Sequence, residues 1–306
     1  MEIPPDLPVT QAFDLAGRGR TWMFDSGPPP APADGDDQAP VLLLHGWTSS
    51  AALNWYRCFP ALSDRYRAIA LDHRGHGRGI RSRRPFRLED CADDAAALVR
   101  QLAVGPCTVV GYSMGGPIAQ LLWLRHPEVV RELVLCATAP SFATRQRPKA
   151  LTNLWFGATV ALSVTPPLLR NLAMDRAVTR WRRNHSASEW AAEEWRRHDP
   201  AAILQAGLAL AKYDATRWLP KVDVPTAIVL TERDTTVAPQ RQRALADLIP
   251  GSQVVPVDAD HRACVDYAGL FVPALLEACD ATRSRSRERL RIKPSNLDPA
   301  VEGAQP

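Results

Sequence analysis

Four short apolar runs, separated by helix-length segments, constrain the fold of this chain more than any other feature. The runs are Val41 to Leu44, Ala68 to Leu71, Thr108 to Val110 and Leu133 to Cys136. Between the second and third runs, Leu88 to Leu102 predicts a helix, since Leu98 and Leu102 lie four residues apart on one helical face. Strands that alternate with helices indicate a largely parallel sheet covered on both faces, so we expect an α/β fold.

The sequence on either side of these runs predicts further elements. Two β-like pieces, near Gln11 to Leu15 and Arg20 to Asp25, flank a Gly-Arg-Gly turn and predict an opening hairpin. The alternation resumes late in the chain with the strand-like Thr226 to Leu230. It is completed by a helix near Pro239 to Leu248, a strand near Gln253 to Val257 and a helix near Ala268 to Cys279.

The alternation breaks between residues 140 and 218, which have a helical pattern and are rich in Trp and Arg. We expect this stretch to be a helical cap or lid inserted into an α/β core, whose two parts are residues 1–139 and 219–280. Within the first part, residues 27–40 are rich in Pro, Gly and Asp and predict a flexible loop. Residues 281–306 are charged and poor in apolar side chains, so they predict a disordered basic tail.

The composition is that of an ordinary globular protein, with 46% hydrophobic and 23% charged residues. The net charge is +4, but the tail holds six Lys and Arg against three acidic residues, which leaves about +1 for the rest. With no nucleic-acid motif beside this charge, we expect no nucleic-acid partner. Six well-separated Cys without a Cys-x-x-Cys pair predict reduced, packed thiols, and the start of the chain shows no signal peptide, so a cytoplasmic location is expected.

The strongest local signal is the hexapeptide Gly111-Tyr112-Ser113-Met114-Gly115-Gly116, which lies between a strand-like run and a helical run. It matches the G-x-S-x-G nucleophile elbow in its strand-turn-helix context. Gly111 and Gly115 lack the Cβ atoms that would crowd the sharp turn carrying Ser113. Backbone N–H groups at the start of the following helix favour an oxyanion formed during acyl transfer. The motif therefore predicts Ser113 as a nucleophile.

A second motif, Leu44-His45-Gly46-Trp47-Thr48, follows the first strand of the parallel part. An α/β fold with a serine nucleophile places its other oxyanion donor at this position. We therefore predict that the main-chain N–H groups of Trp47 and Met114 form the oxyanion hole. We expect His45 to have a structural role, since a lone His-Gly pair more often belongs to a hydrogen-bonded turn than to a catalytic pair.

A third motif, Asp72-His73-Arg74-Gly75-His76-Gly77, follows the second strand. In this order and spacing, the three motifs resemble the α/β-hydrolase superfamily, in its serine hydrolase or esterase-like branch, over about Gln11 to Cys279. The resemblance implies a mostly parallel twisted sheet with helices on both faces and an inserted helical cap. It also implies that the third motif is a structural turn beside the active site, so His73 and His76 are expected to be structural.

The same resemblance implies the two partners of Ser113, because the family's chain order is nucleophile, acid, base. Asp234 lies in a turn after the late strand that resembles the acid-bearing turn of the family, although Thr231 stands where Gly is common. Glu232 is the competing carboxylate. His261 lies just before the last helix and takes the position of the base. It would accept the Ser113 proton while Asp234 holds its tautomer.

The remaining acidic and histidine residues near these motifs are expected to have structural roles. Asp258 and Asp260 are expected to shape the loop that carries His261. His126, His185 and His198 are expected to be surface or helix-capping residues. No metal-binding or nucleotide-binding motif is present in the sequence, so we expect neither a metal nor a cofactor.

The cap carries the features that would select a substrate. Its apolar run from Leu151 to Leu169 is interrupted by Asn153 and Pro166-Pro167, so we expect packing on the body or the wall of a substrate tunnel, not stable membrane insertion. Five of the nine Trp lie in this stretch, at positions 155, 181, 190, 195 and 218. They could line an apolar pocket or anchor the cap, and the nearby Arg could bind an anionic head or solvate the surface.

Together these features predict a cofactor-free serine hydrolase that acts on carboxylic esters or related acyl compounds through an acyl-Ser113 intermediate. Its substrate is expected to be a small molecule, with a hydrophobic acyl group. A carbon–carbon bond hydrolase or an acyltransferase with the same three residues remains an alternative, as does a non-catalytic ligand-binding member of the fold. The sequence does not set the natural substrate or the oligomeric state.

Overall fold

A computed structural model describes residues 7–29, 39–143, 157, 161–162, 165–185 and 188–292. Eight strands of this part form one sheet in the order β1-β2-β4-β3-β5-β6-β7-β8. They are β1 (Gln11–Leu15), β2 (Gly19–Asp25), β3 (Val41–Leu44), β4 (Ala68–Leu71), β5 (Cys107–Tyr112), β6 (Val130–Cys136), β7 (Thr226–Thr231) and β8 (Gln253–Val257). Strand β2 pairs antiparallel with β1 and β4, and all other pairs are parallel. The predicted hairpin and mostly parallel sheet are confirmed.

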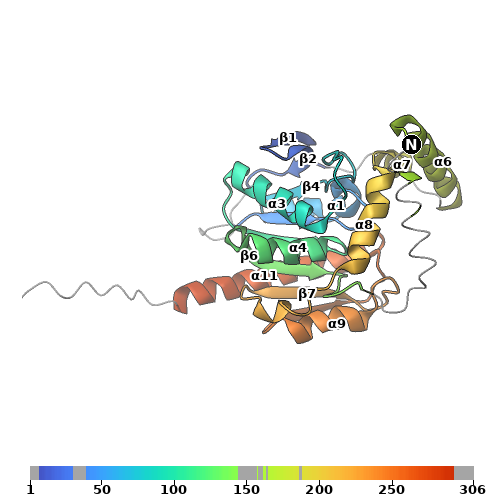
Figure 1. The fold of residues 1–306 in the computed structure, drawn as a ribbon. Coiled ribbons are helices and arrows are strands. Elements are labelled where there is room, and N and C mark those ends of the chain that lie inside the picture. Colours follow the sequence, from blue (N-terminus) through green and yellow to red (C-terminus); the bar gives the residue numbers. More distant parts are fainter. Residues whose placement is uncertain are drawn as a thin grey trace, which may run out of the picture.

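Helices cover both faces of the sheet, as Figure 1 shows for α3 and α4 on one side and α11 on the other. The first face carries α3 (Leu88–Leu102), α4 (Gly115–Arg125) and α9 (Pro239–Leu248). The second face carries α1 (Ala51–Trp55), α2 (Phe59–Ser63), α10 (Ala263–Asp266) and α11 (Ala268–Ile292). Two short 3-10 helices, η2 (Pro127–Val129) and η3 (Leu219–Lys221), precede β6 and β7. The predicted α/β class is therefore confirmed.

Strand β3 shows why continuous apolar runs form the centre of this sheet. Side chains alternate along a strand, so Leu42 and Leu44 pack with the helices of the first face while Val41 and Leu43 pack with those of the second. All four side chains are fully buried. Burying each such side chain contributes about 1.5–3 kcal/mol, which only a strand covered on both sides can gain at every position.

The segment between β6 and β7 contains the helices α6 (Pro167–His185), α7 (Glu189–Arg196) and α8 (Pro200–Lys212). In Figure 1, α8 leads from the body of the molecule toward α6 and α7. The indole Nε1 of Trp47 donates to the Ile203 carbonyl at 2.8 Å and fixes α8 against the loop that follows β3. Most of the predicted apolar run from Leu151 to Leu169 lies outside the described residues, as do residues 30–38 of the predicted flexible loop.

The prediction that a disordered tail begins at residue 281 is wrong for residues 281–292, because α11 continues to Ile292. The side chains of Thr282 and Ser286 are buried against the body. Arg283 lies over the Tyr66 ring, 4.1 Å from its centroid, and donates to the Ala39 carbonyl. Tertiary contacts thus hold this charged end of α11, and composition does not reveal such contacts. Residues 293–306 lie outside the described part.

All six Cys are free and buried, which agrees with the prediction of packed thiols. Burial raises the pKa of each thiol, so all six are protonated at neutral pH. In the described part of the chain, no helix combines the length and the apolar character that crossing a bilayer requires.

Candidate active site

Ser113 lies in the turn between β5 and α4 with a backbone φ of 52°, in the left-handed region that non-glycine residues seldom adopt. Two contacts, one with the last residue of β6 and one with the chain that follows it, hold this strained turn. The Ser113 N–H donates to the Cys136 carbonyl at 2.9 Å, and the Thr138 hydroxyl donates to the Ser113 carbonyl at 2.8 Å. The neighbouring strand therefore fixes the strained backbone that presents the Ser113 side chain.

Three glycines permit this turn because other atoms occupy the space of their missing side chains. A Cβ atom on Gly111 would overlap the Gly115 carbonyl, and one on Gly115 would overlap the Leu44 carbonyl. A Cβ atom on Gly116 would overlap the Thr138 side chain. The steric reason given for Gly111 and Gly115 is therefore met at both positions, since the backbone of α4 approaches β3 and β5 too closely for any side chain.

The structure brings Ser113, His261 and Asp234 together in one row of hydrogen bonds. The Ser113 Oγ lies 3.0 Å from His261 Nε2, and His261 Nδ1 lies 2.7 Å from Asp234 Oδ2. Ser113 and Asp234 are buried, while the His261 side chain is partly exposed. With Nδ1 donating to the carboxylate, Nε2 is left to accept the proton of the Ser113 hydroxyl.

The Asp234 carboxylate is ionised because hydrogen bonds outweigh its burial. Burial alone would raise its pKa, but hydrogen bonds from His261, the Val237 N–H and the Thr231 hydroxyl hold the pKa below its usual value. Its Oδ1 accepts the N–H groups of Thr236 and Val237, each at 2.8 Å. An ionised, immobile carboxylate can fix the His261 ring and stabilise a positive charge on it.

Gln242 in α9 is a residue of this site that the sequence analysis missed. Its side chain is fully buried, and its Nε2 donates to Thr231 Oγ1 at 2.8 Å, to the Val237 carbonyl at 2.7 Å and to Asp234 Oδ2 at 3.2 Å. Its Oε1 accepts the Thr231 N–H at 3.0 Å. The only available signal was a polar residue three positions before Leu245, on the face of the predicted helix that packs on the sheet. Gln242 thus holds the acid-bearing turn at several points.

Thr231, where Gly is common in the family, has a contact that explains its presence. Its hydroxyl donates to Asp234 Oδ2 at 2.9 Å, the same oxygen that His261 contacts. Glu232, the competing carboxylate, is exposed, and its N–H pairs with the Val257 carbonyl. The carboxylate at hydrogen-bond distance from His261 is therefore that of Asp234.

The loop that carries His261 is held by neighbouring polar groups. Tyr112 donates its hydroxyl to the His261 carbonyl at 2.9 Å, a contact that the sequence analysis also missed. Asp258 pairs with Arg233 at 2.7 Å. Asp260 accepts the Arg262 N–H at 2.8 Å. Both aspartates thus shape the loop, in agreement with their expected structural roles.

The two residues expected to donate to an oxyanion flank Ser113. Met114 follows it directly and precedes the first residue of α4, so its N–H belongs to the first helical turn. The loop bearing Trp47 lies against Ser113, since a Cβ atom on Gly46 would be 3.3 Å from the Ser113 Cβ. The Gly46 N–H donates to Asn54 Oδ1 at 3.0 Å, which fixes this loop. Met114 is thus the neighbour of the serine in the chain and Gly46, the residue before Trp47, packs against it, while the role of the two N–H groups as oxyanion donors stays a prediction.

Four buried histidines, His45, His73, His76 and His198, lie together in the interior. The ring centroids of His45 and His73 are 4.1 Å apart, and those of His76 and His198 are 5.7 Å apart. His45 accepts the His73 N–H on Nε2 and contacts the Gly46 carbonyl with Nδ1, so it is a structural residue. The prediction that His198 lies at the surface is wrong, because the Gly77 N–H donates to its Nδ1 at 2.7 Å in the interior.

The other expected histidines lie apart from the site. His126 follows the last residue of α4 and contacts Asp93 at 2.8 Å, in agreement with its expected capping role. The side chain of His185, at the end of α6, lies outside the described part. Within that described part, no group of three or more His, Cys, Asp or Glu has the arrangement needed to hold a metal ion.

A family model described as the alpha/beta hydrolase fold matches residues 39–267. A pimeloyl-(acyl-carrier protein) methyl ester esterase of Aeromonas hydrophila is 28% identical over 242 residues, which cover 76% of this chain and 92% of that protein. A poly(3-hydroxyalkanoate) depolymerase of Ectopseudomonas oleovorans is 26% identical over 251 residues, covering 81% of this chain and 86% of that protein.

Among solved structures, a bromoperoxidase from Bacillus anthracis superposes with a TM-score of 0.70. The superposition covers 89% of this chain and all of that chain, at 21% sequence identity. At this level of identity the similarity concerns the fold alone.

Proposed function

The chain belongs to the alpha/beta hydrolase fold family, and we propose that it is a serine hydrolase acting on carboxylic esters or related acyl compounds. The observation that carries this proposal is the row of hydrogen bonds from Ser113 through His261 to Asp234, at 3.0 and 2.7 Å. A serine hydroxyl becomes a useful nucleophile only when a base can accept its proton, and this row supplies that base.

In the proposed reaction, Ser113 Oγ attacks the ester carbonyl carbon while His261 Nε2 accepts the hydroxyl proton. The carbonyl oxygen becomes an oxyanion, which the N–H groups of Met114 and Trp47 stabilise. His261 then protonates the leaving alcohol, and an acyl-Ser113 ester remains. Water attacks this ester, His261 accepts its proton, and Ser113 leaves with that proton to release the carboxylic acid. Asp234 stabilises the His261 imidazolium in both halves, and no cofactor takes part.

The names of two relatives support ester chemistry, since one is an esterase for a methyl ester and the other a depolymerase of a polyester. We propose residues 140–218 as a cap that covers the acyl-binding side of the site. The support for this is the contact of Trp47 with the Ile203 carbonyl, which joins α8 to the loop of a proposed oxyanion donor. A small molecule with a hydrophobic acyl group is the proposed substrate.

The test is the hydrolysis of p-nitrophenyl esters from acetyl to octanoyl by the unmodified protein and by Ser113→Ala. We expect the substitution to lower kcat/KM by at least a thousandfold with the fold unchanged by circular dichroism. Activity of the variant within tenfold of the unmodified protein would contradict the proposed nucleophile.

The same ester series tests the substrate class separately. Each buried methylene contributes about 0.8 kcal/mol, so kcat/KM is expected to rise from the acetyl to the octanoyl ester. A steady fall with chain length would reject the hydrophobic acyl substrate while leaving Ser113 as the nucleophile.

A further inference from the structure

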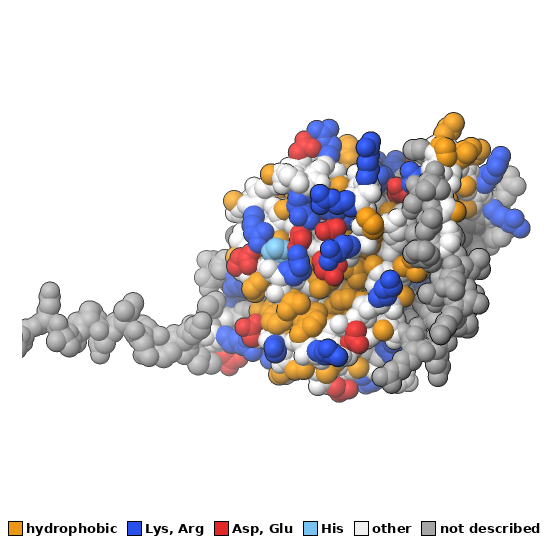
Figure 2. All heavy atoms as spheres, viewed as in Figure 1, with side chains coloured by type: hydrophobic (Ala, Val, Ile, Leu, Met, Phe, Trp, Pro, Cys, Tyr) orange, Lys and Arg blue, Asp and Glu red, His pale blue; other side chains and the backbone are white. Residues whose placement is uncertain are grey.

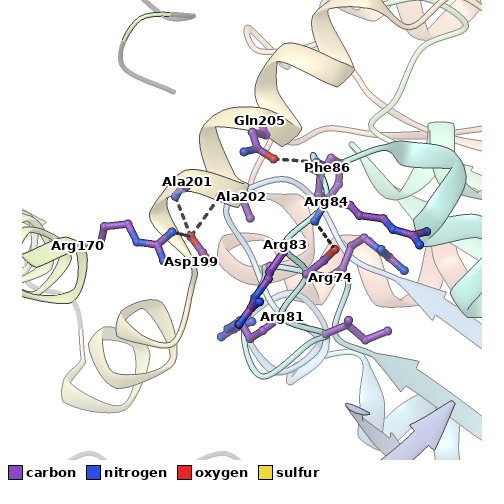
Figure 3. Close-up of a pocket in the computed structure, with 13 residues that line it drawn as sticks. Arg74, Arg81, Arg83, Arg84, Phe86, Arg170, Asp199, Ala201, Ala202 and Gln205 are labelled. Atoms are coloured by element: carbon purple, nitrogen blue, oxygen red, sulfur yellow. Dashed lines mark hydrogen bonds and ion pairs between the residues drawn. The ribbon is translucent and has the colours of Figure 1, made fainter. Parts of the chain in front are cut away.

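A cavity rich in arginine lies apart from Ser113, between the loop that follows β4 and the N-terminal end of α8 (Figure 3). Its volume is about 220 Å³. Its charged lining consists of Arg74, Arg81, Arg83, Arg84, Arg170 and Asp199. None of the residues in the row from Ser113 to Asp234 lines this cavity, so it forms a separate candidate site.

Two of the arginines are neutralised by carboxylates. Arg74 contacts both oxygens of Asp94, each at 2.8 Å. Arg170 reaches from α6 to Asp199 at 3.4 Å, as Figure 3 shows. Asp199 also accepts the Ala201 N–H at 2.9 Å and caps α8, so its carboxylate is already bound on two sides. These contacts leave neither Arg74 nor Arg170 as a source of uncompensated charge.

The other three arginines form no direct ion pair with a carboxylate of the described part. Arg81 donates to the carbonyls of Gly79, Gly77 and Arg197, which are neutral acceptors. Burial of its guanidinium group lowers the pKa of Arg81, and the more distant carboxylates of Asp199 and Asp72 oppose this shift. The side chains of Arg83 and Arg84 form no ion pair with any residue that the structure describes.

On the face of α3 and α4, by contrast, basic and acidic side chains are interspersed, as Figure 2 shows. There Arg125 pairs with Asp93 at 2.8 Å, for example. The loop instead gathers Arg81, Arg83 and Arg84 within four residues and opens them to a cavity. Cations brought together without carboxylates repel one another, and an anion that lies between them relieves this repulsion.

We propose that this cavity binds the phosphate group of a small ligand, with Arg81 and Arg83 as its main contacts. Figure 3 shows these two side chains extending in the same direction, whereas Arg84 extends to the other side. The Arg83 guanidinium group offers two parallel N–H donors that match two oxygens of a phosphate. Arg81, whose Nη atoms already donate to three carbonyls, adds its positive charge and its remaining N–H groups. The double negative charge of a phosphate balances two unpaired guanidinium groups, which a single carboxylate does not.

The size of the cavity fits such a ligand. A water molecule takes about 30 Å³ in the liquid, so 220 Å³ corresponds to roughly seven waters. This is room for a phosphate group and several atoms of the molecule that carries it. The ligand would contact both the core loop and the end of the inserted segment, where the Asp199 N–H donates to the Gly75 carbonyl at 2.9 Å. Binding should therefore stabilise the contact between them, whether or not Ser113 is catalytic.

The test is isothermal titration calorimetry of the whole chain with inorganic phosphate, glycerol 3-phosphate and acetate, at one ionic strength maintained with sodium chloride. Arg83→Gln removes one main contact, and Arg87→Gln is the matched control, because Arg87 is exposed, pairs with Glu89 and does not line the cavity. We expect Arg83→Gln to weaken phosphate binding about tenfold and Arg87→Gln to leave it within twofold. Both variants should melt within about 2 °C of the unmodified protein without phosphate.

Tighter binding of glycerol 3-phosphate than of phosphate would support a phosphate ester as the ligand, and equal binding would support free phosphate. The proposal is overturned if 10 mM phosphate does not bind, if acetate binds as tightly as phosphate, or if Arg83→Gln and Arg87→Gln bind phosphate equally well. Because the titration uses no ester substrate, these results are independent of whether Ser113 proves to be the nucleophile.

Discussion

Acidification from pH 7.5 to 5.0 should destabilise this protein strongly, because it holds four neutral histidines in its interior. Burial, helped by the neighbouring histidines, lowers the pKa of His73 and His198 to about 3. Burial also lowers the pKa of His76 to about 4 and that of His45 well below its usual value. In the unfolded chain each would titrate near pH 6.5, so below that pH the unfolded state binds more protons. Stability is therefore full above pH 6.5 and is lost as the pH falls toward 4.

The size of the loss follows from these values. At pH 5.0, His73, His76 and His198 each favour the unfolded state by about 2 kcal/mol relative to pH 7.5, so these three contribute about 6 kcal/mol. His45 acts in the same direction. Asp72 acts in the opposite direction, because burial raises its pKa to about 6 and the folded state then holds the extra proton. The proton on Asp72 therefore stabilises the folded state by about 1 kcal/mol at pH 5.0. The net loss of about 5 kcal/mol from these four groups is comparable with the whole stability of a typical domain.

Equilibrium urea unfolding followed by tryptophan fluorescence, at pH 7.5 and 5.0, measures this loss. His198→Asn should retain an acceptor for the Gly77 N–H while removing one titrating group. We expect the pH-dependent loss of unfolding free energy to be about 2 kcal/mol smaller in this variant. A loss below 2 kcal/mol in the unmodified protein, or an equal loss in His198→Asn, would refute the assignment of these histidines as buried and neutral.

Three further predictions concern the proposed active site. Asp234→Asn should lower kcat/KM for a p-nitrophenyl ester about 10⁴-fold, while Glu232→Gln should change it less than threefold. The reverse ranking of the two variants would assign the acid role to Glu232. Gln242→Leu should lower kcat about tenfold with KM unchanged and move the acid limb of the kcat/KM profile to higher pH. The reason is that the Asp234 carboxylate, with fewer hydrogen-bond donors, attracts the His261 imidazolium more strongly. An unmoved acid limb would mean that Gln242 has only a structural role. Gly115→Ala should lower the melting temperature by at least 5 °C in calorimetry, because its Cβ would overlap the Leu44 carbonyl, and an unchanged value would contradict that contact.

The sequence predicted those parts of the fold that depend on local pattern. The run Val41 to Leu44 has no polar residue, and only a strand buried on both faces accommodates it, so its burial followed directly. The elbow was predicted for a similar reason, since Gly111 and Gly115 make a turn that nearby backbone would otherwise block. His261 and Asp234 were identified by chain order and resemblance, without any local physical signal.

The features that the sequence missed depend on contacts between distant segments. A buried Gln242 looks like any polar residue of an amphipathic helix until Thr231 and Asp234 are seen beside it. His198 becomes buried only because the inserted segment packs on the loop that contains Gly77. Helix α11 extends past residue 281 because Arg283 contacts Tyr66 and the Ala39 carbonyl, whereas the charge of that stretch alone predicted disorder.

Labelling with a fluorophosphonate tests the central claim most directly, because this reagent bonds covalently to a serine only when a neighbouring base activates it. The protein is incubated with the reagent and digested, and the modified peptide is identified by mass spectrometry. The proposed row from Ser113 to Asp234 predicts one adduct, on Ser113, which is lost in Ser113→Ala and strongly slowed in His261→Ala. An unlabelled Ser113 in folded protein, or an adduct on another serine, would contradict the account.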